Sequence, residues 1–416
     1  MKWCWETTTV PGDLMSQKDL SDFFANYMGA NSLFKNKAVL QSAHVPDTIL
    51  HRDNEITVVA GILAPALKLD KPSNIFVYGQ AGCGKTLSIR HVTKEIEKHA
   101  VNNNIKLRVL YINCKLKRIA DTEYRLIAQL SREYGKSIPP TGLPTDEVYK
   151  TFHQAVDSNG GINIIILDEI DELVKKVGDE ILYSLTRMND ELQNSKISII
   201  GISNDMVFLE ALDPRVKSSL SEEEIMFAPY NALQLQDILI QRAKEAFKES
   251  AIEPGVIEKC AAYAAREHGD ARRCMELLRV AGEIAERNNF DRVSIEHIDA
   301  ADEKIERDRL MVILTTQPKQ SQATLYAITS ISMGKKGNIF TGDVYELYKT
   351  VCSRISLRPL TQRRVSDIIA ELDMLGMINV KVISKGRYGR TREISLSVPG
   401  TSTPRIKRIL EEALSL

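Results

Sequence analysis

The sequence predicts an α/β protein of three domains, because the pattern of apolar residues changes twice along the chain. In the first region, strand-like apolar runs alternate with amphipathic helical stretches, which is typical of a parallel sheet with crossover helices. From Leu233 to about Arg307 the pattern is purely helical. The last region has three helical stretches followed by a two-stranded hairpin. We therefore place the domains at residues 1–230, 231–310 and 311–416.

The spacing of apolar residues defines the elements of each region. In the first region, strands are predicted at Asn74–Tyr78, Leu107–Ile112, Ile162–Leu167 and Ile197–Ile202. In the second, helices are predicted at Val256–Arg266 and Ala271–Asn288. After a break at Thr315–Pro318, the predicted elements are helices at Gln320–Ser332, Thr341–Ser356 and Thr361–Leu375 and strands near Asn379–Ser384 and Glu393–Val398. Three helices followed by a hairpin describe a winged helix.

The composition narrows the class of protein. Hydrophobic residues make up 43% of the 416 residues, which is enough to form buried cores. No stretch of about 18 consecutive apolar residues occurs, so we expect no contact with a membrane. The six cysteines are scattered without a Cys-x-x-Cys pair, which suits neither a disulfide framework nor a zinc site. We expect a cytoplasmic protein with reduced thiols.

The formal net charge of zero hides an asymmetry along the chain. From Met311 to the end there are 16 lysines and arginines and 8 aspartates and glutamates, a net charge of +8, so the rest of the chain carries −8. A basic domain beside an acidic body is typical of a protein that binds nucleic acid. Charge alone leaves open a solvated surface on which basic residues cluster by chance.

A complete phosphate-binding sequence, G-x-x-x-x-G-K-[ST], follows the first predicted strand and precedes a helix. Its glycines let backbone N–H groups curl around phosphate oxygens, and the N-terminus of the helix adds its positive dipole end. Lys85 can reach the β and γ phosphates, and the Thr86 hydroxyl can ligate Mg²⁺. The residues that would contact ATP or ADP here are Gly79, Gln80, Ala81, Gly82, Cys83, Gly84, Lys85, Thr86 and Leu87.

Two acidic residues, Asp168 and Glu169, end the strand predicted at Ile162–Leu167. Parallel sheets bind their ligands at the carboxyl ends of their strands. Asp168 can therefore hold Mg²⁺ through water, and Glu169 can orient and activate the water that attacks the γ-phosphate. The pair follows the phosphate-binding sequence at about the spacing that such a nucleotide site needs.

With these residues the chain resembles a known family. Leu167–Leu173 resembles the Walker B signature of AAA+ ATPases, in particular that of the archaeal origin-recognition (Orc/Cdc) replication initiators. Ile200–Asn204 resembles their sensor one, and Gly269–Arg273 resembles their sensor two. The resemblance implies an AAA+ P-loop parallel-sheet base with a helical lid, followed by a C-terminal winged helix. It also implies that Asn204 holds the lytic water or the γ-phosphate and that Arg272 couples lid closure to the nucleotide.

The resemblance extends to the adenine side of the pocket. It implies that Tyr230, together with Arg242 on the next helix, lines the nucleotide pocket. It also implies that an upstream segment containing Val45, His51 and Arg52 packs near the adenine. From the residue types alone, Tyr230 is equally well interpreted as a core aromatic residue.

Two further segments match the family with less definite roles. Arg215, in Leu212–Leu220, is either a trans-acting arginine finger or a solvated surface arginine. Gly135–Pro144 falls where initiators insert a short helix that grips the DNA backbone. By residue type the same segment is only a loop rich in proline and glycine.

The helix predicted at Thr361–Leu375 fits a recognition helix. Its apolar residues at helical spacing face the core, and its exposed first turn carries Gln362, Arg363 and Arg364, where such helices meet base edges in the major groove. The hairpin tip is basic, which suits phosphates or a narrow minor groove, and it carries Arg387, Arg390 and Arg392. A winged helix that makes protein contacts is the alternative.

We therefore interpret the chain as an ATP-dependent replication initiator that binds double-stranded origin DNA. The resemblance implies recruitment of the MCM helicase, partnership with other initiator paralogues, a nucleoid-associated location, and weak ATPase activity that acts as a switch. One alternative is a clamp-loader-like AAA+ subunit, which would carry a helical collar in place of the hairpin. Another is a winged-helix transcription regulator with an ATP-binding fold, against which the intact Lys85, Thr86, Asp168 and Glu169 argue.

Overall fold

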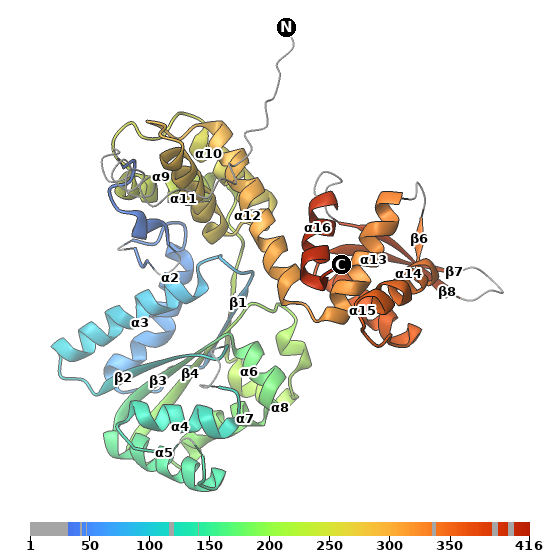
Figure 1. The fold of residues 1–416 in the computed structure, drawn as a ribbon. Coiled ribbons are helices and arrows are strands. Elements are labelled where there is room, and N and C mark those ends of the chain that lie inside the picture. The colour runs from blue at the N-terminus through green and yellow to red at the C-terminus, as the bar shows by residue number, and fades with distance from the viewer. Residues whose placement is uncertain are drawn as a thin grey trace, which may run out of the picture. The chain divides into compact units, whose positions relative to one another are not determined.

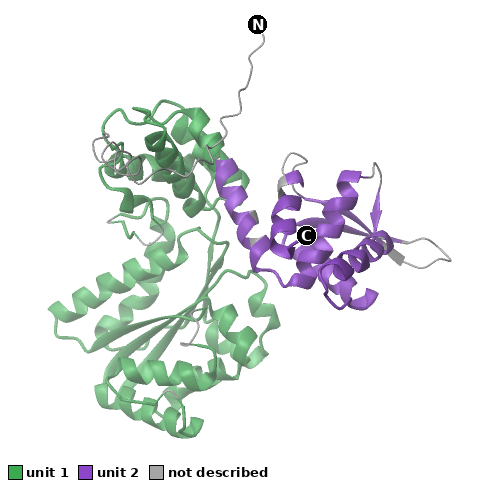
Figure 2. Ribbon diagram, viewed as in Figure 1, with its two compact units in different colours: residues 1–301 green, residues 302–416 purple. Residues whose placement is uncertain are grey.

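The computed structural model describes residues 32–41, 44–46, 48–115, 120–139, 141–334, 338–384, 390–397 and 403–416. The chain divides into two compact units, residues 1–301 and 302–416 (Figure 2). The division falls within one helix, α12 (Ile295–Thr316), and so does the predicted boundary between residues 310 and 311. We describe each unit by itself.

The first unit is built on a five-stranded parallel sheet in the order β2-β3-β4-β1-β5. Its strands are β1 (Ile75–Gly79), β2 (Leu107–Asn113), β3 (Gly161–Asp168), β4 (Ser195–Ser203) and β5 (Glu223–Phe227). Four of the five match the predicted strands. The fifth, β5, was not predicted, because it is an edge strand that opens with two exposed glutamates, and its apolar run is limited to Ile225–Phe227.

Helices cover both faces of this sheet, which explains the apolar runs of its central strands (Figure 1). On one face, α2 (Asp53–Leu63) and α3 (Lys85–Asn102) pack against residues such as Ile75 and Ile164. The opposite face contributes residues such as Phe76 and Ile165. Its covering helices are α4 (Glu123–Glu133), α5 (Thr145–Asn159), α6 (Ile170–Val177), α7 (Glu180–Arg187) and α8 (Pro214–Leu220).

Helices form the lid that follows the sheet. They are α9 (Ala232–Ala246), α10 (Val256–Arg266), α11 (Ala271–Arg287) and the start of α12. Residues 32–41, which include the short 3-10 helix η1 (Lys37–Leu40), also pack on the lid, although the first predicted domain includes them. The ring of Phe34 packs against that of Phe247, with their centroids 4.5 Å apart and their planes tilted by 33°. A segment distant in sequence thus completes the lid core.

The second unit has the winged-helix order of elements, as predicted. These are α13 (Lys319–Gly334), β6 (Ile339–Phe340), α14 (Thr341–Arg354), α15 (Gln362–Met374), β7 (Ile378–Ser384) and β8 (Arg390–Leu396). The strands form an antiparallel sheet in the order β6-β8-β7. Two elements of this unit were not predicted from the sequence. They are the two-residue strand β6 and the final helix α16 (Thr403–Leu414), which contributes Ile406 and Leu410 to the core of this unit.

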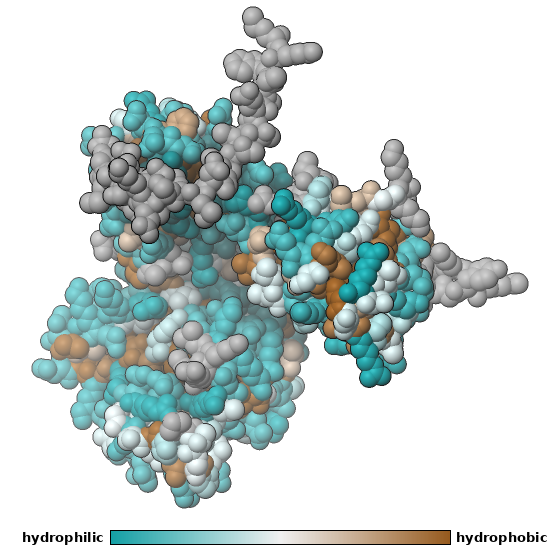
Figure 3. All heavy atoms as spheres, viewed as in Figure 1, coloured by the Kyte–Doolittle hydropathy of each residue, from teal (hydrophilic) through white to brown (hydrophobic). Residues whose placement is uncertain are grey.

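The surface of each unit is mostly hydrophilic on the face that Figure 3 shows, with hydrophobic side chains in small separate groups. Such scattered groups are normal on a protein surface. Among the helices that the structure describes, none combines the length and the apolar composition that crossing a membrane requires.

Candidate functional site: a nucleotide cavity and a basic helix

The phosphate-binding sequence forms a tight turn between β1 and α3. Gly82 and Gly84 have φ angles of 73° and 91°, a region that residues with side chains rarely adopt. A Cβ atom on Gly84 would lie 2.7 Å from the hydroxyl oxygen of Tyr230, and one on Gly82 would lie 1.7 Å from Oδ1 of Asp270. Backbone conformation and close packing therefore both require glycine at these two positions.

Lys85 lies at the centre of this site. Its Nζ donates hydrogen bonds to the backbone oxygens of Gly79 and Gln80, both at 2.8 Å, and to Oδ1 of Asn204 at 2.9 Å. Burial lowers the pKa of Lys85 below its ordinary value of 10.5. The fold thus brings the lysine of the phosphate loop next to Asn204, which follows β4.

A hydroxyl and a carboxylate meet beside Lys85. Thr86 Oγ1 donates to Oδ2 of Asp168 at 2.9 Å, and the Tyr111 hydroxyl donates to the same oxygen at 2.7 Å. Burial raises the pKa of Tyr111, and the hydrogen bond to Asp168 raises it further, so the phenol remains a donor. Oxygen atoms of this kind are the ligands that Mg²⁺ takes, so Thr86 and Asp168 fit the ion predicted here.

Glu169 directly precedes α6 as its N-cap residue and has a left-handed conformation, with φ 55° and ψ 47°. Such a conformation is costly for a residue with a side chain and is often found at functional sites. The Glu169 carboxylate forms an ion pair with Nζ of Lys115 at 3.2 Å, and the Lys115 side chain is 67% exposed. Exposed ion pairs contribute little free energy, so this pair leaves the carboxylate able to exchange partners.

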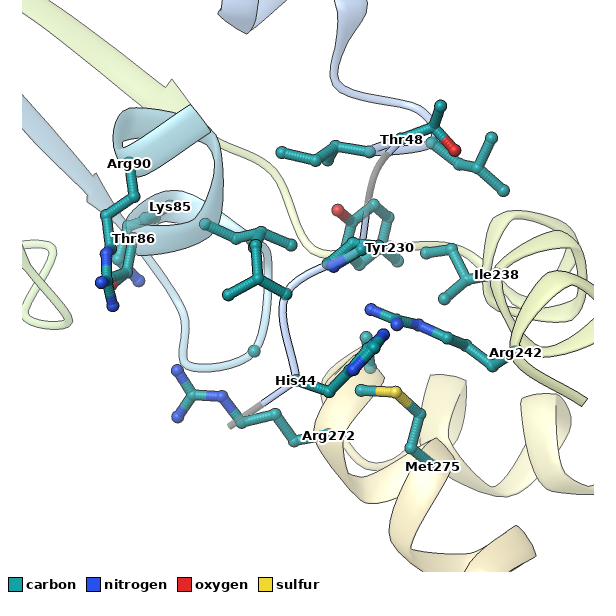
Figure 4. A pocket seen from close by; sticks show the side chains of 18 of the residues that line it. His44, Thr48, Lys85, Thr86, Arg90, Tyr230, Ile238, Arg242, Arg272 and Met275 are labelled. Carbon is teal, nitrogen blue, oxygen red and sulfur yellow. The ribbon is translucent and has the colours of Figure 1, made fainter. Parts of the chain in front are cut away.

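A cavity of about 450 Å³ is lined in one part by Lys85, Thr86, Asp168, Glu169 and Asn204 (Figure 4). The lid lines another part, with Ile238 and Arg242 from α9 and with Arg272 and Met275 from α11. In Figure 4, the phosphate loop with Lys85 lies on one side, and Ile238 and Arg242 lie on the other. The cavity therefore has a polar end suited to phosphates and a more apolar end suited to a flat base.

Arg242 provides a test of whether a nucleotide fits this cavity. The residue is only 5% exposed, and within the described part of the chain its Nη1 has no hydrogen-bond partner. Burial lowers the pKa of Arg242. A buried donor without an acceptor costs free energy, and the ring nitrogens of a purine are acceptors. The residues present therefore fit a purine nucleotide.

The second candidate surface is the start of α15. Thr361 caps the helix, because its side-chain oxygen accepts a hydrogen bond from the backbone N–H of Arg364. Gln362, Arg363 and Arg364 are exposed, whereas the apolar residues of the helix are buried. Arg364 also forms ion pairs within the helix, at 3.6 Å to Asp367 and 3.9 Å to Glu371, which compensate part of its charge.

Three protein-family models match this chain in order. They describe an AAA domain at residues 69–204, a Cdc6 AAA+ ATPase-type lid domain at 236–303 and a CDC6 C-terminal winged helix domain at 313–403. An ORC1-type DNA replication protein of Thermococcus onnurineus is 52% identical over 388 residues, which cover 92% of this chain and 93% of that protein. This chain belongs to the ORC1-type DNA replication proteins.

Other relatives agree with this assignment to the ORC1-type proteins. ORC1-type DNA replication protein 1 of Methanosarcina mazei is 49% identical over 395 residues, 94% of each chain. The structure of Aeropyrum pernix ORC1 in complex with DNA is 44% identical, has a TM-score of 0.80 and covers 92% of this chain and 96% of that one. The comparisons therefore confirm the predicted family and its fold of an AAA+ base, a helical lid and a winged helix.

Arg52 of this ORC1-type protein packs against the phosphate loop instead of lining the cavity. Its Nε donates to the backbone oxygen of Cys83 at 2.9 Å and its Nη2 to that of Ala228 at 2.5 Å. Its guanidinium lies 4.0 Å from the centre of the Tyr230 ring. His51 does not line the cavity either; its Nε2 lies 2.9 Å from Oδ2 of Asp237 on α9, in the lid.

The other predicted nucleotide-site residues divide into two groups. Those that line the cavity are Val45, Gly82, Gly84, Lys85, Thr86, Leu87, Asp168, Glu169, Asn204, Tyr230, Arg242 and Arg272. Gly79, Gln80, Ala81 and Cys83 shape the loop but are not among the residues lining the cavity. Several lining residues were not predicted, because they belong to no motif that residue spacing reveals; among them are Thr48, Arg90, Tyr111, Gln241 and Met275.

Three predicted regions outside the cavity have distinct outcomes. Arg392 Nη1 donates to the backbone oxygen of Ser366 at 2.5 Å, so it joins the wing to α15, whereas Arg387 and the side chain of Arg390 lie outside the described residues. Arg215 is 74% exposed and pairs with Asp213 at 3.1 Å. Between α4 and α5 no helix occurs in the described residues of 134–144, where an inserted helix was expected.

Proposed function

We propose that this chain is an ATP-dependent DNA replication initiator that binds double-stranded origin DNA. The observation that carries the proposal is the assembly of one nucleotide site, in which Lys85 contacts Asn204 and Thr86 contacts Asp168 in a cavity that Arg272 of the lid also lines. Its relatives are DNA replication proteins, and one was solved in complex with DNA. Together these findings support a nucleotide-controlled protein that acts on DNA.

The residues of the cavity suggest how ATP is bound and hydrolysed. Lys85 would exchange its hydrogen bonds to the loop carbonyls for bonds to the β and γ phosphates. Mg²⁺ held by Thr86 and Asp168 would neutralise charge on the phosphate oxygens. Glu169 would accept a hydrogen bond from the attacking water and orient it, and Asn204 would hold that water or the γ-phosphate. ADP would occupy the same site after hydrolysis.

The contact between the lid and the phosphate loop would allow the site to act as a switch. Arg272 lies in the first turn of α11, and its backbone N–H donates to Oδ1 of Asp270 at 2.7 Å. The Asp270 carboxylate lies against Gly82 of the phosphate loop, so the γ-phosphate and the lid meet at one place. We propose that ATP draws Arg272 inward, and that slow hydrolysis releases it. The weak ATPase activity thus times a conformational state.

The start of α15 is the element that we propose to read DNA. Gln362, Arg363 and Arg364 would meet base edges in the major groove, and the wing arginines Arg387 and Arg390 would contact phosphates or a narrow minor groove. Arg392 would keep the wing in place through Ser366. Two DNA contacts of different kinds would combine positioning with base readout.

The remaining parts of the proposal concern partners and place. We propose that the DNA-bound form recruits the MCM helicase, acts with other initiator paralogues, and works in the cytoplasm in association with the nucleoid. The β7–β8 hairpin and the match to a CDC6 winged helix favour this function over a clamp-loader-like subunit. The presence of Lys85, Thr86, Asp168 and Glu169 in the lining of the cavity favours it over a transcription regulator that does not hydrolyse ATP.

Fluorescence anisotropy of labelled duplexes tests this function. The full-length protein should bind an origin duplex more tightly than a scrambled one, with an affinity that falls steeply with salt and differs between ATP and ADP. Arg363→Ala should weaken origin binding by roughly tenfold or more, since a good base contact contributes about 1–3 kcal/mol of discrimination. Arg408→Ala is the matched control, because Arg408 is 82% exposed on α16, away from α15 in sequence. Failure of the protein to bind any duplex would refute the proposal.

A further inference from the structure

Residues 32–41, which we call the anchor segment, are fixed to the lid by their backbone. The N–H groups of Lys35 and Asn36 both donate to the backbone oxygen of Ala246, at 2.7 and 3.1 Å. In return, the N–H of Lys248 donates to the backbone oxygen of Leu33 at 2.9 Å. These bonds surround the end of α9, so the anchor segment extends the lid as if it were one of its own elements.

Side chains strengthen this attachment along α11. Oε1 of Glu286 accepts hydrogen bonds from the Ser32 hydroxyl and from the backbone N–H of Leu33, both at 2.7 Å. Nζ of Lys37 lies 2.6 Å from Oε1 of Glu283, whose side chain is only 12% exposed. The bond from the Leu33 N–H to Glu286 is partly buried, and a charged hydrogen bond in such a position is stronger than a neutral one, so it helps to specify where the segment sits.

A glycine in α11 makes room for the aromatic side chain of the anchor. Phe34 is 8% exposed and lies directly over Gly282. A Cβ atom on Gly282 would lie 2.5 Å from Cζ of Phe34 and 3.0 Å from Cε1 of Phe247. Glycine inside a helix costs roughly 0.5–1 kcal/mol relative to alanine. Its presence here is explained by the close approach of the Phe34 ring.

Directly after the anchor segment, the chain forms a wall of the nucleotide cavity. His44, Val45, Pro46 and residues 48–50 all line it, and His44 and Thr48 are visible in Figure 4. The chain is then fixed to the base through Arg52, whose Nε donates to the Cys83 carbonyl of the phosphate loop. The cavity wall therefore lies between one attachment on the lid and another on the base.

From this arrangement we propose that the anchor segment positions the wall of residues 44–46 and 48–50 and controls the rate at which nucleotide leaves the cavity. The inference rests on the proposed function, because it assumes that the cavity binds ATP and ADP. The anchor residues are not among those that line the cavity, so they act as positioning residues through the wall.

The contacts of the wall itself explain why the anchor has this role. Two side-chain contacts join the wall region to α9, Thr48 Oγ1 to Gln241 Nε2 at 2.8 Å and His51 to Asp237 at 2.9 Å, and both are exposed. Exposed polar contacts contribute little free energy. The buried Phe34 contact contributes more, since burial stabilises an aromatic side chain substantially. Release of the anchor would therefore free the wall, and with it the nucleotide.

The test measures dissociation of ADP that carries a fluorophore on its ribose from the full-length protein, by chasing with unlabelled ADP. Gly282→Ala should displace Phe34 and raise the dissociation rate at least about tenfold, which corresponds to about 1.4 kcal/mol. Gly61→Ala is the matched control, because Gly61 lies in α2 with no atom within 4 Å of an added Cβ. It should release ADP at the rate of the unaltered protein.

A compensating variant separates positioning from general damage to the lid. Phe34→Leu shortens the side chain that the methyl group added by Gly282→Ala would strike first, so the double variant should release ADP more slowly than Gly282→Ala alone. Restoration is partial, because the methyl group still lies 3.0 Å from Cε1 of Phe247. Phe34→Ala should release ADP quickly, whereas Phe290→Ala, at an exposed phenylalanine of the same lid, should not. Unchanged release rates in Gly282→Ala and Phe34→Ala, or no rescue by the double variant, would overturn the anchor's role. Failure of the unaltered protein to bind either nucleotide would overturn the proposed function as well.

Discussion

Replacing Arg52 by methionine tests how the phosphate loop is held in place. The Arg52 side chain is 4% exposed, donates to the carbonyls of Cys83 and Ala228, and pairs with Glu55 at 2.8 Å. The variant leaves the buried Cys83 carbonyl, the partly buried Ala228 carbonyl and the Glu55 carboxylate without their partner, and it removes the stacking of the guanidinium on Tyr230. Breaking a fully buried pair costs about 3–5 kcal/mol. Because the Glu55 side chain is 20% exposed and can be hydrated, we expect the free energy of unfolding to fall by about 3 kcal/mol or less.

The nucleotide site should lose affinity in the same variant. The Cys83 carbonyl belongs to the phosphate loop, so the loop loses a hydrogen bond that fixes its backbone when Arg52 is replaced. We expect the affinity for ATP, measured by calorimetry, to fall at least about fivefold, or roughly 1 kcal/mol. Unfolding in urea, followed by circular dichroism, gives the change in stability.

A matched control compares the effect of replacing a buried arginine with that of replacing an exposed one. Arg215 also forms an ion pair, with Asp213, but its side chain is 74% exposed. Exposed pairs contribute little, so Arg215→Met should leave both the urea midpoint and the ATP affinity close to those of the unaltered protein. An Arg52→Met protein that unfolds at the same urea concentration as the unaltered protein would refute the reasoning.

Three further predictions follow from the site and the sheet. Lys85→Ala should reduce ATP affinity at least about tenfold by calorimetry, because the charge that meets the phosphates is lost; unchanged affinity would contradict the site. Glu169→Gln should keep ATP binding but abolish phosphate release in a turnover assay, and persistent turnover would show that another group activates the water. Asp157 accepts backbone N–H groups, above all that of Asn194, which lowers its pKa below 3.8. Its stabilising effect should be present above that pH and lost as the pH falls, so acid unfolding of Asp157→Asn should depend less on pH; an unaltered acid profile would contradict this.

The phosphate loop and the acidic pair were predictable because their chemistry is local in sequence. A glycine turn between a strand and a helix needs few residues, and the carboxylates at the end of β3 are adjacent to one another. Resemblance to the family then added Asn204 and Arg272. Both of these residues line the cavity, as do the lysine of the loop and the two carboxylates.

The role of Arg52 could not be predicted in the same way. Its partners are backbone carbonyls at Cys83 and Ala228, which carry no sequence signal and lie far along the chain. The anchor segment could not be predicted either, because its Phe34 packs over Gly282 of α11, which is far along the chain. Contacts between distant segments depend on the whole fold, whereas residue spacing reveals only neighbours along the chain.

The strand β5 and the wing show two other reasons for missed predictions. The first two residues of β5 are exposed glutamates at the edge of the sheet, so its apolar run, Ile225–Phe227, is too short to identify a strand from the sequence. Arg392 is one of three arginines grouped by charge near the hairpin tip, yet its side chain bonds to the backbone of α15. Charge patterns predict that a region is basic, but they do not distinguish an arginine that supports the fold from one that binds DNA.

Mapping protected DNA along the host chromosome tests whether this protein binds the sites where replication starts. The intact protein would be cross-linked to DNA in cells, alongside a variant with alanine at Arg363 and Arg364 of the recognition helix. We expect sharp protection at the sites where replication starts, and loss of protection at those sites in the variant while the protein level stays the same. Protection spread evenly over the chromosome, or the same sites in both proteins, would contradict the account.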